Sequence, residues 1–140
     1  MPARKLTAAD VTFEVEIEQD CTDFRGNAMA SGDDEADAEY ERQIAEALNR
    51  GQVEAWCTIV VKAIWSPDGE DMTLEGIDTL GGCCFLEPIE VNGETWSIDR
   101  QVEEHVSSHG MREEALRALN AELASQRKAA RKLLRATGGR

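Results

Sequence analysis

The chain has 140 residues, of which 41% are hydrophobic, enough for one domain that buries about two-thirds of its unfolded surface. It carries 28 acidic and 15 basic residues, a formal net charge of -13, which disfavours nucleic acid and anionic membranes as direct partners of the acidic part. No segment approaches the roughly 18 consecutive apolar residues of a membrane span, so we expect no membrane association and a cytoplasmic protein.

The charge is sorted by position along the chain. From Asp10 to His109 there are 25 acidic residues and five basic ones, whereas residues 110–140 contain eight basic and three acidic residues. The acidic part would attract and steer a basic protein surface toward itself. We therefore expect a basic protein, or a basic nucleic-acid-binding complex, as the partner.

The first two elements have clear periodicity. Apolar residues alternate with Glu14, Glu16 and Glu18 over residues 11–18, which predicts a strand with one buried face and one acidic face. The polar cluster at residues 31–34 offers an N-cap, and Gly51 offers a left-handed C-terminal position, so the sequence predicts a helix between them. Its apolar stripe is Ala36, Tyr40, Ile44, Ala47 and Leu48.

The middle of the chain predicts further strands. Residues 53–65 carry an unbroken apolar face and suit a central strand, and the turn composition at residues 66–69 returns the chain antiparallel over residues 72–80. Gly81 and Gly82 suggest a bulge or a close backbone approach. Asn92 and Gly93 are typical of a short hairpin turn.

The last third is predicted to be helical. Ser97 or Asp99 can cap a short helix, Gly110 breaks it, and a longer helix is expected over residues 111–135. Its expected docking stripe is Leu116, Leu119, Leu123, Ala130 and Leu133. The cations near its end are Arg127, Lys128, Arg131, Lys132 and Arg135, which suit the helix dipole and could also contact phosphates, the acidic part or a second subunit.

Together these elements predict an α+β fold. A small antiparallel sheet with helices packed on one face, a two-layer sandwich, buries the apolar strand faces most simply, and the long helix closes the chain. We expect a single domain over residues 1–140, with flexible ends at residues 1–9 and 137–140.

The sequence offers little support for catalysis or cofactor binding. Cys21, Cys57, Cys83 and Cys84 lack the paired spacing of a zinc site and are interpreted as reduced thiols, and His105 and His109 share a helix face without further ligands. No serine elbow, phosphate-binding loop or dinucleotide fingerprint is present. We therefore expect no catalytic residues, no metal and no cofactor, with a thiol or zinc enzyme as the alternative.

The candidate binding residues are acidic, with one aromatic anchor. Neighbouring carboxylates on an extended strand are about 6.8 Å apart, at roughly 3.4 Å rise per residue, and such rows can imitate the phosphates of DNA. Trp56, Val60 and Ile64 would form an apolar patch if helices cover only the other face of the central strand. The predicted partner-binding residues are Glu14, Glu16, Glu18, Asp33, Asp34, Asp37, Glu41 and Trp56.

Several segments of the sequence resemble a known group of small proteins. Residues 25–33, the acidic helix after them, Ala55-Trp56-Cys57 and residues 80–84 resemble small acidic proteins of phages and bacterial mobile elements, over roughly residues 11–86. In type, the chain is similar to phage anti-CRISPR and other anti-defence proteins, which implies occupation of a basic nucleic-acid site. The basic C-terminal helix departs from uniformly acidic DNA mimics.

The leading hypothesis is a non-enzymatic, mobile-element inhibitor that docks its acidic face onto a basic, nucleic-acid-binding surface of a host defence complex. The alternative is a homodimeric structural or accessory phage protein, paired through the Leu116–Leu133 stripe or the Trp56 patch.

Overall fold

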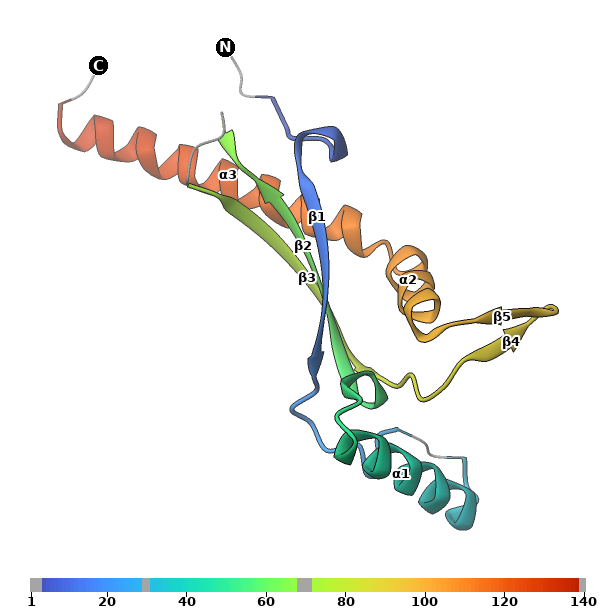
Figure 1. The fold of residues 1–140 in the computed structure, drawn as a ribbon. Coiled ribbons are helices and arrows are strands. Elements are labelled where there is room, and N and C mark those ends of the chain that lie inside the picture. The colour runs from blue at the N-terminus through green and yellow to red at the C-terminus, as the bar shows by residue number, and fades with distance from the viewer. Residues whose placement is uncertain (1–3, 29–30, 68–71, 139–140) are drawn as a thin grey trace. The chain divides into compact units, whose positions relative to one another are not determined.

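The computed structural model describes residues 4–28, 31–67 and 72–138. Its fold is α+β, as predicted, with a long C-terminal helix (Figure 1). The elements, in chain order, are η1 (Ala8–Asp10), β1 (Thr12–Gln19), α1 (Asp34–Asn49), η2 (Val53–Ala55), β2 (Cys57–Trp65), β3 (Leu74–Cys83), β4 (Ile89–Val91), β5 (Glu94–Trp96), α2 (Ile98–Ser108) and α3 (Met111–Ala136).

The contacts within the chain define two compact units. Unit 1 comprises residues 1–14, 61–78 and 111–140, and unit 2 comprises residues 15–60 and 79–110. The three long strands pass through both units, because each unit boundary in the sheet falls inside β1, β2 or β3. The expectation of a single domain stays a prediction.

The larger sheet has the strand order β1-β2-β3, so β2 is central. Cys57, Ile59, Val61 and Ala63 are completely buried on it, which confirms the predicted central strand. Residues 53–55, expected to begin this strand, instead form the 3-10 turn η2. The predicted turn at residues 66–69 lies partly in residues 68–71, outside the described residues.

β1 differs from its prediction. None of its residues is buried: Phe13 and Ile17 are half-buried, and 36% of Val15 is exposed. The alternation of apolar and acidic residues correctly predicts a strand, but the expected buried face is wrong. An edge strand has one neighbour only, and therefore its apolar side chains receive less cover than those of β2.

In unit 1, α3 packs directly against β3 at Gly76. A Cβ atom added to Gly76 would lie 2.1 Å from the carbonyl oxygen of Ala115 and 2.3 Å from the backbone nitrogen of Leu119. The helix therefore covers one face of the sheet here, at a distance that only glycine permits. Its buried residues are Met111, Ala115, Leu119 and Leu123.

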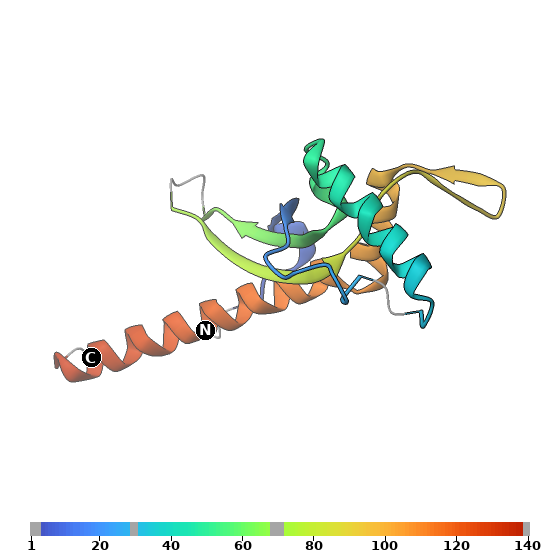
Figure 2. The ribbon, with the colours of Figure 1, turned by 90° about the horizontal axis from the view of Figure 1, so that it is seen from below.

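The predicted apolar stripe on α3 is buried in the middle of the helix, as expected, but it is exposed near the end of the helix, where the prediction is wrong. Leu119 and Leu123 are buried, but Leu116 is half-buried, Ala130 is exposed and 65% of Leu133 is exposed. Figure 2 shows the end of this helix extending past the strand ends of unit 1, where no strand lies beside it.

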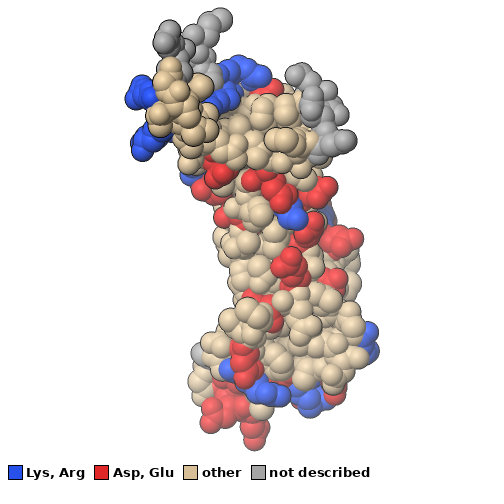
Figure 3. Space-filling view, turned by 90° about the vertical axis from the view of Figure 1, so that its left-hand side faces the viewer, with Lys and Arg blue, Asp and Glu red and all other residues tan. Residues whose placement is uncertain are grey.

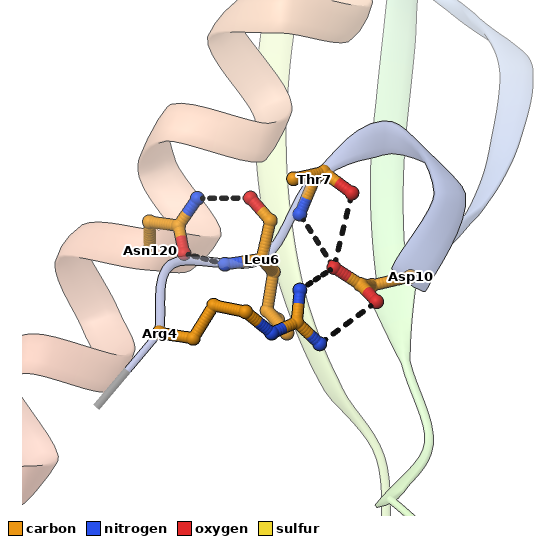
Figure 4. Close-up of polar contacts among 5 residues, drawn as sticks. All are labelled: Arg4, Leu6, Thr7, Asp10 and Asn120. Atoms are coloured by element: carbon orange, nitrogen blue, oxygen red, sulfur yellow. Dashed lines mark hydrogen bonds and ion pairs between the residues drawn. The ribbon is translucent and has the colours of Figure 1, made fainter. Parts of the chain in front are cut away.

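The N-terminal segment is fastened to α3. The backbone N–H of Leu6 donates to Oδ1 of Asn120 at 2.9 Å, and Nδ2 of Asn120 donates to the Leu6 carbonyl at 3.0 Å (Figure 4). Arg4 pairs with Asp10 at 2.7 Å, and its guanidinium donates hydrogen bonds that lower the pKa of the Asp10 carboxyl. Residues 4–9, expected to be flexible, thus form a hydrogen-bonded turn with Leu6 buried.

In unit 2, α1 packs on η2 and on the loops beside it. Ile44 and Ala47 join Ala55 and Trp56 in one buried cluster, as the predicted stripe requires. The helix makes its main contacts with η2, the 3-10 turn that precedes β2. Gly51 has a φ of 86°, confirming its predicted C-terminal position.

The other predicted turns and caps of unit 2 are present. Asn92 and Gly93 have φ values of 51° and 82°, which close the β4–β5 hairpin with Val91 opposite Glu94. Ser97 caps α2 by accepting a hydrogen bond from the backbone N–H of Arg100.

The sheet face opposite α3 follows from strand alternation. Gly76 faces α3, so Glu75 and Ile77 point to the opposite face, which we call the open face. Gly81 lies four residues after Ile77 on the same strand and therefore faces the same side of the sheet. A Cβ atom on Gly81 would contact the side chains of Asp20 and Thr58. Asp20 and Thr58 thus mark the open face. Glu14 is an even number of residues from Asp20, and Lys62 is an even number of residues from Thr58, so strand alternation places both on the open face as well.

Replacing Gly76 with alanine should destabilise the chain. The added methyl group would overlap helix backbone, which cannot rotate away, and we expect a loss of about 3 kcal/mol or more in the free energy of unfolding. Urea denaturation measures this loss, with Thr79→Ala, an exposed position on the same strand, as the control. A Gly76→Ala variant as stable as the control would contradict the packing of α3 on β3.

Candidate functional site

The net negative charge of the chain is located in unit 2. This unit contains 18 acidic and four basic residues, a net charge of -14, while unit 1 contains ten acidic and eleven basic residues. The division differs from the one along the sequence, because the acidic residues of residues 61–78 offset the cations of α3 within unit 1. The candidate site is therefore the surface of unit 2.

Three of the predicted acidic residues stabilise the start of α1. The Asp33 carboxylate accepts hydrogen bonds from the backbone N–H groups of Glu35 and Ala36, at 3.1 and 3.2 Å. Asp34 and Asp37 lie in the first turn, where a carboxylate interacts favourably with the helix dipole. Asp33 and Asp34 are exposed and Asp37 is half-buried, so all three add negative charge at or near the surface.

Asp37 and Glu41 also hold the loop that precedes the helix. Asp37 accepts a 2.7 Å hydrogen bond from the Ser31 hydroxyl, and Glu41 accepts one of 2.8 Å from the backbone N–H of Gly26. Their carboxylates thus have partners within the chain, and Glu41 is half-buried. The sequence did not reveal this structural use of two residues that it assigned to partner binding.

The predicted row on β1 is acidic along its whole length. Glu14 and Glu18 are exposed, and Glu16 is half-buried. Glu14 belongs to unit 1, and Glu16 and Glu18 belong to unit 2. Acidic side chains are visible on the molecular surface in Figure 3, coloured red.

The basic residues of unit 2 cancel little of this charge. Arg42 pairs with Glu39 and, at 2.6 Å, with Glu46 on the same helix. Arg100 pairs with Glu94 at 2.9 Å and covers the ring of Trp96, 4.7 Å from its centroid. These cations are surrounded by a larger number of carboxylates, and the unit keeps its large negative charge.

Trp56 is not the exposed anchor that the sequence predicted. Only 3% of it is exposed, and its indole N–H donates a 2.9 Å hydrogen bond to the carbonyl of Thr22. Val60 is buried too, with 6% exposed, and Ile64 is half-buried. The expected Trp56 patch is wrong because the loop after β1 and helix α1 cover the tryptophan.

A different apolar feature lies on unit 2. A shallow groove between the β4–β5 hairpin and α2 is lined by Ile89, Trp96, Gln101, Glu104, His105 and Ser108. Ile89 is 43% exposed, and the Trp96 indole N–H is buried without a hydrogen-bond partner among the described residues. The sequence signal for it was Ile89 and Trp96, which face each other at the open end of the predicted hairpin.

Asp20, which the sequence analysis did not single out, forms the main buried polar network. Its carboxylate accepts hydrogen bonds from the Thr22 hydroxyl at 2.6 Å, the Thr22 N–H at 2.8 Å, the Gly82 N–H at 2.7 Å and the Thr58 hydroxyl at 3.0 Å. These bonds, first that of the Thr22 hydroxyl, lower the pKa of Asp20 to about 2. The network joins the end of β1 to β2 and to the Gly81-Gly82 segment of β3, where Gly82 has a φ of 67°.

Asp20→Asn should reduce the stability of the fold by about 2 kcal/mol at neutral pH, because an amide accepts fewer of these hydrogen bonds. The depressed pKa stabilises the folded state above the ordinary aspartate pKa of 3.8, and this contribution disappears as the pH falls toward 2. The difference in unfolding free energy between wild type and variant, measured in urea, should therefore shrink over that range. A difference that is zero at neutral pH would contradict the role of the network.

The thiols are poor nucleophile candidates. Burial raises the pKa of Cys57 to about 12 and also raises the pKa values of Cys83 and Cys84. The Tyr40 hydroxyl lies 3.1 Å from the sulfur of Cys84. A nucleophilic cysteine needs a lowered pKa, so these environments oppose that use. Cys21 is exposed.

The histidines form a stacked pair on α2. The ring centroids of His105 and His109 are 5.7 Å apart, and each Nδ1 lies within hydrogen-bonding distance of a carbonyl four residues earlier, at 3.1 and 2.9 Å. His105 also meets Phe85 edge to face. Within the described residues, no group of three or more His, Cys, Asp or Glu residues could hold a metal ion.

Alkylation should distinguish the four thiols. We expect iodoacetamide at mildly alkaline pH to modify Cys21 quickly in the folded protein and the other three only after unfolding, because burial disfavours their thiolates. Peptide mass spectrometry measures the rate at each site. Fast modification of Cys57, Cys83 or Cys84 in the native state would restore a thiol enzyme as a hypothesis.

Comparison with known protein families, with curated proteins and with solved structures finds no match to this chain. Among the described residues, no helix is long and apolar enough to cross a membrane.

Proposed function

We propose that the chain is a non-catalytic binding protein that places the acidic surface of unit 2 on the basic, nucleic-acid-binding surface of a host protein complex. In this proposal it acts as a phage or mobile-element inhibitor of host defence, as its resemblance to such proteins implies. The observation that carries the proposal is the charge division, with a net charge of -14 in unit 2 and +1 in unit 1.

Electrostatic attraction would bring the two surfaces together. A field of this density steers a basic partner and raises the association rate, most strongly at low ionic strength. Glu16 and Glu18 on β1 and Asp33 and Asp34 at α1 would take places that phosphates occupy on nucleic acid. A surface that binds in this way competes with nucleic acid for the partner.

The hairpin groove would supply the apolar contact that the buried Trp56 cannot. Interfaces usually centre on a desolvated apolar contact with a charged rim, and Ile89 beside Glu104 has this composition. Apolar contacts formed after docking slow dissociation, whereas the surrounding charges chiefly set the association rate. The two parts of the site therefore predict separable kinetic effects.

The proposal is tested by capture from host-cell lysate at low salt. Wild-type protein on beads should retain a nucleic-acid-binding protein that elutes with salt and with competing duplex DNA. The variant Glu18→Lys/Asp34→Lys/Glu35→Lys should no longer retain this protein, and its association with the purified partner should be slowed about tenfold or more. Ile89→Ser should instead speed dissociation, as surface plasmon resonance would show.

A matched variant separates local from total charge. Glu113→Lys/Glu114→Lys/Glu122→Lys changes the net charge by the same amount and also places two lysines in the first turn of a helix, but in unit 1. It should bind like wild type, and circular dichroism checks that both variants fold. Equal losses in both variants, or a captured protein that duplex DNA does not displace, would count against a specific acidic site on unit 2.

A further inference from the structure

The C-terminal part of α3 is not buried against any described residue of unit 1. From Ala124 to Ala136, which we call the arm, no residue is buried, and Leu133 and Leu134 are 65% and 57% exposed. An isolated helical segment of this length is marginal in water, so a helix of this kind is usually stabilised by packing. Exposed leucines on such a helix indicate a missing contact.

The arm is amphipathic. Ala130, Leu133 and Leu134 continue the buried stripe of Leu119 and Leu123 at helical spacing. The basic residues Lys128, Arg131, Lys132 and Arg135 line a groove along another side of the helix. Figure 3 shows blue side chains gathered at this end of the molecule.

The cations of the arm also lack an ion-pair partner among the described residues of their own unit. Within the described residues of unit 1, Arg127, Lys128, Arg131, Lys132 and Arg135 form no ion pair, whereas Arg117 earlier on the helix pairs with Glu114. The negative end of the helix dipole accounts for the residues of the last turn only. The arm therefore fits a surface that is acidic and partly apolar.

Such a surface exists in unit 1 itself, on the open face of the sheet. Gly76 places α3 on the other face, and Ile77 is 46% exposed on the open one. Glu75 flanks it on the same strand, and Glu14 is exposed on the same face of β1. Lys62 lies on the same face of the central strand β2, so this part of the face combines one lysine with an exposed apolar side chain and a carboxylate on each edge strand.

We propose that the arm of one molecule lies on the open sheet face of a second copy, and that the second copy returns the same contact. The leucines of the arm would cover Ile77, and its cations would pair with Glu14 and Glu75. A reciprocal contact of this kind gives a closed two-fold dimer. The proposal does not depend on the function proposed for unit 2.

The occupant is a second copy because of the charge outside the arm. Outside the arm, unit 1 carries ten acidic and six basic residues, so a basic arm meets a complementary surface in unit 1 of another copy. Pairing of two arms would instead place the five cations of one arm beside the five cations of the other, and the two arms would repel each other. Nucleic acid would satisfy the cations but not the exposed leucines, and it would be repelled by the rest of the chain.

Charge reversal on each side tests the pairing. Light scattering should find that wild type is a dimer at high concentration that dissociates with salt. Lys128→Glu/Arg131→Glu/Lys132→Glu in the arm and Glu14→Lys/Glu75→Lys on the face should each give monomers, because like charges then meet. An equimolar mixture of the two variants should dimerise again, because both contacts are complementary in the mixed pair.

Controls on the same molecules keep the proposal falsifiable. Leu133→Ser/Leu134→Ser should weaken the dimer without changing its salt dependence, and circular dichroism confirms helix content. A wild-type monomer at its highest soluble concentration overturns the proposal, as does a mixture that stays monomeric. A monomer whose arm binds duplex DNA or anionic phosphatidylserine vesicles would assign the arm to nucleic acid or to a membrane surface instead.

Discussion

One buried carboxylate connects the ends of the three long strands. Asp20 receives hydrogen bonds from Thr58 of β2 and from Gly82 of β3, and it directly follows β1. The partners keep it ionised, because each bond favours the charged form, and they satisfy a group whose burial would otherwise be costly. With the strand ends held in this way, the loop after β1 turns outward to α1, and Trp56 fills the space beneath it.

This arrangement explains why so much negative charge remains near the surface. β1 is an edge strand, so its glutamates are not covered by another strand, and the acidic first turn of α1 suits the helix dipole. Asp33, Asp37 and Glu41 also stabilise the fold, through a helix cap and through loop contacts. The same carboxylates therefore contribute both to the stability of the fold and to the attraction of a basic partner. Removing one of them should change the stability and the attraction together.

Features set by neighbouring residues could be predicted from the sequence, and features set by distant residues could not. The bounds of α1, the Asn92-Gly93 hairpin and the cap of α2 depend on a few adjacent residues; the structure confirms the first two and selects Ser97 over Asp99 as the cap. The partners of Asp20 lie up to 62 residues away, and the contact of Gly76 is with α3. Trp56 had an exposed and a buried interpretation, and only the packing of α1 and the loop decides between them. The candidate charges could be read from composition, but their division between two units required the contacts of the folded chain.

The central claim is that the negative charge of unit 2 is uncompensated at its surface in solution. Nuclear magnetic resonance with a cationic and an anionic paramagnetic cosolute of the same size reports the electrostatic potential near each amide. The account predicts that the cationic probe accumulates at α1 and the β4–β5 hairpin while the anionic probe accumulates at the arm of α3. Equal relaxation by the two probes at α1 and the hairpin would contradict it.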